Sequence, residues 1–324
     1  MNERVLVTGG AGCIGAWICK LLVADGDIPV AADIDQNDQR LREIMSPEEL
    51  AAVRFVRTDI TDQEAIRRAA TVDGKVSRII HTAAMQVPYV RKDPVLGAMV
   101  NVVGTVNVFE TAKSLGVDRT VYASSVAVYG PPERYDTPVL PDDATLAPTE
   151  HYGVHKQCNE GSALVYWLHD GISSIGLRPH TVYGPGRDRG LTSQPTLAMR
   201  AAARGESFSI GYGGQSGFMF VEDVARTFIL ASTVPFEGAE VYGMKGQVAD
   251  MAEIVATISE VAGAKPGQIR FEPQPLAFPA GMDDTELRRL LGKIPDRSLE
   301  EGIRDSVEHF AIARAAETNG IEDS

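Results

Sequence analysis

The segment Thr8-Gly9-Gly10-Ala11-Gly12-Cys13-Ile14-Gly15 decides the fold, because it follows the short apolar run Arg4–Thr8 and precedes an amphipathic stretch. Its glycines Gly9, Gly12 and Gly15 are spaced as GxxGxxG. Such glycines allow a tight turn, a close approach of backbone to a pyrophosphate, and close packing of a helix on a sheet. Free N–H groups and the dipole at a helix N-terminus favour a bound anion. A glycine pattern alone also fits a structural turn, but a strand before it and a helix after it favour a dinucleotide-binding loop.

An acidic residue supports this interpretation. Asp33 ends the apolar run Pro29–Asp33 and lies 18 residues beyond Gly15. A carboxylate at this place can accept both hydroxyls of the adenosine ribose and would repel a 2′-phosphate. Asp35 and Asp38 add negative charge, and no arginine follows immediately. The sequence therefore predicts NAD rather than NADP as the cofactor, with a solvated strand-end aspartate as the alternative reading of Asp33.

From the first residue to about residue 185, short β-branched apolar runs alternate with segments of helical periodicity. This alternation predicts βαβ units around a parallel sheet whose two faces are both covered. We expect strands at Arg4–Thr8, Pro29–Asp33, Arg54–Arg57, Arg78–His81, Thr120–Ala123 and Ser174–Arg178. We expect helices at Gly12–Asp25, Ser46–Ala52, Asp62–Thr71, Pro94–Leu115 and Tyr152–His169.

The alternation stops after Pro179, where Gly- and Pro-rich stretches separate the expected helices Gln194–Arg204, Val221–Ala231 and Leu299–Ala316. The predicted fold class is α/β, a Rossmann doubly wound parallel sheet with a smaller C-terminal substrate-binding lobe. Residues 1–178 are expected to form the NAD-binding domain. Residues 179–324 are expected to form the lobe, partly interleaved with that domain.

Tyr152 and Lys156 lie four residues apart at the start of an expected helix, so their side chains share one face. A phenol normally titrates near 10. A nearby ammonium and the positive nicotinamide ring favour the phenolate, which can then exchange a proton with a substrate hydroxyl. Lys156 can also hold the nicotinamide ribose.

The pair Ser124-Ser125 lies at the carboxyl end of a strand, where open α/β sheets bind ligands. The Tyr-x-x-x-Lys motif alone is common by chance; this context favours its catalytic reading.

The overall composition excludes several classes of partner. The 324 residues carry a net charge of −13, which argues against nucleic acid because phosphate binding needs clustered Lys and Arg. Apolar runs are short, which predicts no membrane span, and the apolar segment from Val5 leaves no room for a signal peptide before it. The scattered Cys13, Cys19 and Cys158 show neither a metal-ligand spacing nor a disulfide framework. We expect no metal and a cytoplasmic location.

Several motifs recur in an order that resembles the extended short-chain dehydrogenases/reductases, and most closely the NAD-dependent epimerase/dehydratase family. The resemblance covers nearly the whole chain, and its motifs are specific for the fold, the cofactor and hydride transfer but not for the substrate. The segments that carry it are Thr8–Gly15, His81–Ala84, Asn101–Thr105, Ser124–Gly130, Tyr152–Lys156, Leu177–Gly186, Phe218–Ala225 and Ser298–Ile303.

The resemblance implies roles for individual residues. The catalytic group is expected to be Ser125, Tyr152, Lys156 and Asn101, with Asn101 supporting the helix that carries the active site. Members of the family commonly form dimers through the two long helices, here Pro94–Leu115 and Tyr152–His169, so a homodimer is expected. Together with the loop and the ribose acid, the expected cofactor contacts are Gly9, Gly12, Cys13, Ile14, Gly15, Asp33, Asp59, Ile60, Ala83, Ala84, Tyr152, Lys156 and Pro179.

The chain departs from the family's nucleotide-sugar enzymes at two places. They usually carry Asn at the position of Thr181, and an Arg–Asp pair where this chain has Ser216-Gly217. Loss of an arginine that grips the diphosphate disfavours a nucleoside-diphosphate sugar. Dehydratases tend to carry an acid directly after the catalytic hydroxyl, whereas Val126 follows Ser125 here. An aliphatic side chain transfers no proton, so dehydration is disfavoured.

The loop around Arg187 and Arg189 is the most distinctive sequence on the substrate side. One of these arginines is expected to clamp a carboxylate or phosphate of a small polyol or sugar-acid substrate; a solvated loop with Asp188 pairing locally is the alternative. Gln86 and His180 are the other expected substrate contacts besides Ser125, although His180 equally fits a packed histidine.

The sequence therefore predicts an NAD-dependent oxidoreductase that transfers a hydride at a secondary alcohol carbon. Release of the ketone makes such an enzyme a dehydrogenase, whereas return of hydride to the other face makes it an epimerase. A nucleotide-sugar epimerase is the main alternative. A non-catalytic dinucleotide-binding regulator is a further one, although such proteins usually lose the tyrosine or the lysine that Tyr152 and Lys156 retain here.

Overall fold

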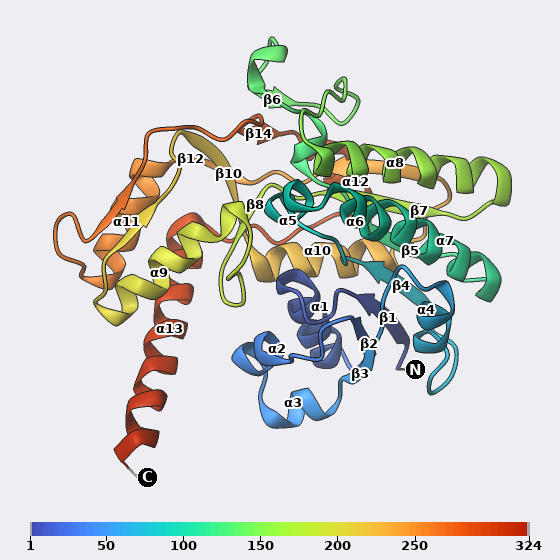
Figure 1. The fold of residues 1–324 in the computed structure, drawn as a ribbon, viewed down its shortest axis with the longest axis horizontal. Helices are drawn as coiled ribbons and strands as arrows, with labels where there is room; N and C mark the ends of the chain where they lie inside the picture. The colour runs from blue at the N-terminus through green and yellow to red at the C-terminus, as the bar shows by residue number, and fades with distance from the viewer. Residues whose placement is uncertain (1, 323–324) are drawn as a thin grey trace.

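The computed structural model describes residues 2–322, with the side chains of residues 2–315. Its centre is a seven-stranded parallel sheet in the order β11-β7-β5-β4-β1-β2-β3 (Figure 1), which is the predicted doubly wound arrangement. Five predicted strands have the expected bounds, β2 begins one residue earlier, and β11 was not predicted. The strands are β1 (Arg4–Thr8), β2 (Ile28–Asp33), β3 (Arg54–Arg57), β4 (Arg78–His81), β5 (Thr120–Ala123), β7 (Ser174–Arg178) and β11 (Ala239–Gly243).

Helices cover both faces of this sheet (Figure 1). Successive side chains of a strand point to opposite faces. Accordingly Val5 and Val7 of β1 pack on the side of α1 (Cys13–Ala24) and α10 (Val221–Thr233), while Leu6 packs on the other side. That other side is covered by α4 (Gln63–Ala69), α7 (Gly104–Leu115) and α8 (His151–Asp170). Burial on both faces explains why these strands read as continuous apolar runs.

A smaller lobe with its own core lies beside the sheet (Figure 1). It contains the three-stranded sheet β12-β10-β8 and three helices that pack on one another, and the chain leaves it after β10 to form β11 before returning at β12. The division at residue 178 as a domain boundary stays a prediction. The elements of the lobe are β8 (Thr181–Tyr183), α9 (Gln194–Arg204), β10 (Gln215–Phe220), β12 (Gln247–Asp250), α11 (Met251–Ala262) and α13 (Leu299–Glu322).

Short elements connect these layers. Two small parallel pairs, β9 with β13 and β6 with β14, lie outside the large sheets. The helices α2, α5, α11 and α12 were not predicted. The bounds are α2 (Gln39–Ile44), α3 (Pro47–Ala51), α5 (Val87–Lys92), β6 (Val139–Leu140), β9 (Phe208–Ile210), β13 (Ile269–Phe271), β14 (Gly281–Met282) and α12 (Thr285–Leu291), together with the 3-10 turns Val126–Val128, Pro132–Arg134 and Leu191–Ser193.

The predicted helix Pro94–Leu115 is continuous but not uniform. It starts as α6 (Pro94–Ala98), passes through a π-helical turn at Met99–Val103, and continues as α7. Single π-helical turns inside α-helices often occur at functional sites, and this one carries Asn101. Pro94–Leu115 is also the one described helix whose length and apolar composition would let it cross a membrane, and 44% of that window is buried within the fold.

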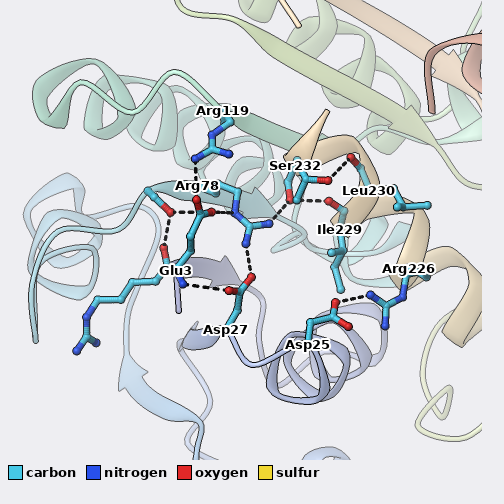
Figure 2. Close-up of polar contacts among 12 residues, drawn as sticks. Glu3, Asp25, Asp27, Arg78, Arg119, Arg226, Ile229, Leu230 and Ser232 are labelled. Carbon is cyan, nitrogen blue, oxygen red and sulfur yellow. Dashed lines mark hydrogen bonds and ion pairs between the residues drawn. The ribbon is translucent and has the colours of Figure 1, made fainter. Parts of the chain in front are cut away.

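A buried ionic cluster ties the amino ends of the strands together (Figure 2). Arg78 begins β4 and is only 2% exposed. Its Nε lies 2.6 Å from a carboxylate oxygen of Glu3, in an ion pair without hydrogen-bond alignment, and its Nη2 pairs with Asp27. Nη1 donates to Ser232 Oγ at 3.0 Å. Arg78 therefore connects β1, the turn before β2, and α10 at the edge of the sheet opposite the candidate site.

Candidate active site

The glycine loop lies at the carboxyl end of β1, beside the end of β4. Here the strand order reverses, and such switch points are where open α/β sheets bind ligands. Gly9 has φ +73°, and a Cβ on it would lie 2.7 Å from the backbone nitrogen of Ala83, so this crossing requires glycine. A cavity of about 530 Å3 opens over the loop. Ten predicted cofactor residues line it: Gly9, Gly12, Cys13, Ile14, Gly15, Asp33, Asp59, Ile60, Ala83 and Ala84.

The acidic residues at the rim of this cofactor cavity are held by backbone groups. Asp33 Oδ2 accepts a hydrogen bond from Ala11 N at 3.0 Å, which joins the acid to the glycine loop, and Oδ1 accepts one from Asp35 N at 3.1 Å. Burial raises the pKa of Asp33, and these two bonds oppose the rise. Asp59 Oδ1 accepts from Thr61 N at 2.9 Å. Both carboxylates are therefore fixed at the rim of this cavity, at the carboxyl ends of β2 and β3.

A second, smaller cavity of about 180 Å3 continues from the first. Ile14, Thr82, Ala84, Gln86 and Arg187 line both cavities. The structure brings five more of the predicted residues together in the smaller cavity: Ser125, Tyr152, Lys156, Pro179 and His180.

Tyr152 and Lys156 face this cavity from the first turns of α8. Lys156 Nζ donates to the carbonyl of Ala123 at 2.6 Å and lies 5.7 Å from the centre of the Tyr152 ring. Burial lowers the pKa of Lys156 to about 8, and the charge of Glu160 opposes this shift. Burial raises the pKa of Tyr152 above its usual value, against a hydrogen bond with Ser125 and the charge of Arg187. The expected lowering of the Tyr152 pKa therefore does not prevail in this structure, because desolvation of the phenolate is the larger effect.

The two neighbouring serines have different surroundings. Ser125 Oγ accepts from Ala127 N at 3.1 Å, and the Ser125 side chain lies near enough to Tyr152 to favour a lower pKa of that phenol. The Ser124 hydroxyl is buried and donates to Glu160 Oε1 at 2.5 Å, so it is occupied by a structural bond. The geometry thus places Ser125, not Ser124, beside the tyrosine.

Asn101 braces the segment that both cavities share. Its Oδ1 accepts from Met85 N at 2.7 Å, and its Nδ2 donates to Met85 O at 2.9 Å. These two hydrogen bonds to Met85 fix the backbone between β4 and α5, from which Gln86 projects. Asn101 does not line either cavity.

The loop after β8 separates the two predicted arginines. Arg187 lines both cavities, whereas the exposed Arg189 lines only the cofactor cavity. Asp188 pairs with Arg40 of α2 at 2.7 Å, and Arg40 Nη1 also donates to Ala11 O at 2.9 Å. Asp188 therefore does not pair within its own loop, which was the alternative considered above. It pairs with Arg40 on the other side of the cofactor cavity.

His180 contributes a ring surface rather than a free nitrogen. Its Nε2 lies 2.7 Å from the carbonyl oxygen of Pro279, and its Nδ1 accepts from Thr181 N at 2.9 Å. Burial lowers the pKa of His180 to about 4, so the ring is neutral. Phe278 packs edge-on against it with ring centres 5.3 Å apart, and also lines the smaller cavity.

Sequence reasoning missed several residues of the site. Phe278 lies in a Pro-punctuated stretch, and Arg40 and Thr192 reach the cavities only through tertiary structure. Glu160 was also missed, although its position four residues after Lys156 put it on the same helix face. It forms a buried bidentate pair with Arg178, at 2.9 and 2.8 Å.

Comparison with known proteins gives consistent results. Residues 5–243 match the family described as NAD dependent epimerase/dehydratase family. A UDP-glucose 4-epimerase of Mycolicibacterium smegmatis is 33% identical over 95% of this chain and 98% of its own length. A D-erythronate dehydrogenase of Cupriavidus necator is 34% identical over 48% of each chain. The crystal structure of a Thermus thermophilus UDP-glucose 4-epimerase in complex with NAD superposes with a TM-score of 0.81 at 28% identity, covering 95% of this chain and 98% of that one.

Proposed function

The chain belongs to the NAD-dependent epimerase/dehydratase family, and from that premise we propose that it oxidises or reduces a secondary alcohol carbon of a small sugar, sugar-acid or polyol substrate, with Tyr152 as the acid/base. The observation that carries this proposal is that Ser125 and Tyr152 line one cavity, which shares five residues with the cofactor cavity. A substrate hydroxyl placed between these two groups has its carbon beside the site where the nicotinamide would lie.

The geometry of the cofactor cavity fits NAD. Gly9 crosses Ala83 so closely that no side chain fits, and Asp33 stands at the rim with a carboxylate for a ribose. When bound, NAD supplies the two-electron hydride acceptor or donor.

Each residue then has a defined task. Ser125 holds the substrate hydroxyl, and Tyr152 takes its proton in oxidation or returns it in reduction. Lys156, in its charged form, stabilises the phenolate.

Replacement of Tyr152 by Phe tests the proposal. Loss of the phenol should lower kcat for NADH formation about 100-fold or more, because proton transfer has no substitute in the cavity. NAD binding, measured by calorimetry, should remain within about twofold of the wild type, since a ring of the same size fills the site. Full activity in Tyr152→Phe would refute the proposed role.

The smaller cavity favours a dehydrogenase of a compact substrate. Ser216, at the position of the missing diphosphate arginine, is 1% exposed and bonds Thr181 Oγ1 at 2.8 Å. A Cβ on Gly217 would lie 3.2 Å from the His180 ring. Neither residue lines the cofactor cavity or the smaller cavity, and neither carries a positive charge for a diphosphate.

A nucleotide-sugar epimerase is the second candidate, and the 33% identical UDP-glucose 4-epimerase favours it. The two candidates differ in one readout. A panel of sugars, sugar acids, polyols and nucleotide sugars should give net NADH with a dehydrogenase, whereas an epimerase forms an isomer without net NADH. Isomer formation from a UDP-sugar alone would decide for the epimerase.

We also propose that the protein is a homodimer through the face that Pro94–Leu115 and α8 share. These helices pack side by side, and their outer face exposes apolar side chains. Contiguous exposed apolar surface of this kind marks an interaction site. Light scattering should give twice the mass of one chain, and Val165→Asp should shift it toward the monomer. The exposed residues are Val95, Leu96, Met99, Val103, Val154, Leu164, Val165 and Leu168.

A further inference from the structure

Two polar atoms beside the smaller cavity have no partner among the described residues. They are the Nε–H donor of Arg187 and the amide oxygen acceptor of Gln86, and both side chains line the cavity. Buried polar groups are nearly always hydrogen-bonded, because an unmade bond leaves the full desolvation penalty in place. A free donor and a free acceptor on neighbouring side chains point to a ligand that carries both kinds of group.

The loop that carries Arg187 is fixed before any ligand arrives. Trp17 Nε1 donates to Pro185 O at 2.9 Å, Arg187 Nη2 donates to Thr192 Oγ1 at 3.0 Å, and Asp188 is paired with Arg40. Bonds of this kind reduce the ordering cost that a ligand would otherwise meet. The guanidinium is therefore a preorganised element rather than a side chain on a mobile loop.

Gln86 is held against the same loop. A Cβ on Gly190, whose φ is +97°, would lie 2.0 Å from Gln86 Oε1 and 3.5 Å from Arg187 Nη2. The absence of a side chain at this position thus lets the amide and the guanidinium lie on either side of one glycine. Any larger residue would push Gln86 away from the cavity wall.

We infer that Arg187 and Gln86 form a subsite for the carboxylate and an adjacent hydroxyl of a short-chain polyhydroxy acid; this inference rests on the proposed function. The guanidinium donates to the carboxylate in a charge-assisted bond, and Gln86 accepts from a substrate hydroxyl. The carbon held by Ser125 and Tyr152 gives up a hydride to NAD+, its hydroxyl proton passes to the tyrosine, and a keto acid and NADH result.

The size of the cavity limits the length of this acid. A volume near 180 Å3 is well below the roughly 300–1,000 Å3 of sites for drug-sized ligands. It suits a compact substrate such as an acid of about four to six carbons. Arg189 has no part in this subsite, because it lines only the cofactor cavity.

The test compares substrates with and without the carboxylate. NADH formation is measured with four- to six-carbon aldonates, with alditols of equal length, and with phosphorylated alditols that offer a different anion. Wild type is expected to prefer aldonates. Arg187→Gln should lower kcat/KM for aldonates about 100-fold and for alditols less than about threefold, with Arg187→Lys in between. Arg134→Gln, which removes the same charge from the exposed turn Pro132–Arg134, serves as the matched control.

Three outcomes would overturn the inference. Equal kcat/KM for aldonates and alditols in the wild type would mean that the subsite does not recognise a carboxylate. A preference for phosphorylated alditols would mean that it recognises a phosphate instead. Equal losses for all substrates in Arg187→Gln, with a raised KM for NAD, would make Arg187 a cofactor ligand. In each case Tyr152-dependent NADH formation leaves the proposed function standing, whereas no NADH with any substrate refutes the proposed function itself.

Discussion

Two buried arginines stand at opposite edges of the same sheet, and they differ in what they hold. Arg78 begins β4 and pairs with Glu3 and Asp27 (Figure 2), whereas Arg178 ends β7 and pairs with Glu160 of α8. Both are almost fully enclosed, at 2% and 4% exposed. The first connects only structural elements, because ligands bind open α/β sheets at the carboxyl edge of the strands.

The second cluster reaches the groups proposed for catalysis. Glu160 lies one helical turn after Lys156 and accepts the hydroxyl hydrogen of Ser124, the neighbour of Ser125. Arg178 extends the network to the Tyr129 hydroxyl at 2.6 Å and to the carbonyl of Asp142 at 2.8 Å. The comparison teaches that one chemical arrangement serves the fold at one edge and, at the other, lies beside the residues proposed for catalysis.

The largest effect is expected from Arg78→Met, which breaks the structural cluster. Removing one partner of a buried ion pair leaves its carboxylates unpaired, and such changes cost about 3–5 kcal/mol. The lower end applies, because Glu3 is 36% exposed and water can screen it. Urea unfolding should show a lower midpoint at an unchanged slope. The kcat of the folded protein should stay within about twofold of the wild type, and a large fall would place the cluster in the functional machinery.

Glu160→Gln is expected to act on both stability and pH dependence. The Glu160 carboxylate favours the charged form of Lys156, whose pKa is already lowered to about 8 by burial. Removing that charge lowers the pKa of Lys156 further, so the charged lysine is lost at lower pH. The alkaline limb of the kcat profile should therefore move to lower pH, and kcat at neutral pH should fall about tenfold.

The matched control for this change is Asp27→Asn at the opposite edge, which also removes one carboxylate from a buried arginine. Its pH profile should coincide with that of the wild type although its stability falls. An unshifted alkaline limb in Glu160→Gln would reduce Glu160 to a structural role like that of Asp27.

Local patterns were sufficient to predict six strands of the central sheet, among them the partly buried edge strand β3. β1, β3, β4, β5 and β7 have the predicted bounds because their apolar runs are bounded by turn residues or charge. The edge strand β11 was missed, since its sequence Ala-Glu-Val-Tyr-Gly is only partly buried and carries a charge. Helices as short as α2 and α5 hold too few residues to establish a period, and Pro88 lies inside α5.

The candidate site divides in the same way. The glycine loop and the Tyr152–Lys156 pair are local in sequence, and they lie where the pattern predicted. The two arginine clusters were not predicted, because Arg78 and Asp27 are 51 residues apart and the bond exists only through the sheet. Glu160 was within reach of sequence reasoning, since positions 152, 156 and 160 share one helix face.

The smallest effect is expected at the rim of the first cluster, where Arg226 pairs with Asp25 (Figure 2). These side chains are 28% and 38% exposed, so water and salt screen their attraction. Exposed ion pairs contribute about 0–1 kcal/mol, and Arg226→Gln should lower the free energy of unfolding by no more than that. Urea unfolding at low and high salt checks this value, because a screened pair should lose its contribution as salt rises. Arg78 and Arg226 lie at the same edge of the sheet and differ mainly in their access to water. A loss of stability as large as that of Arg78→Met would therefore mean that burial does not determine how much each ion pair contributes.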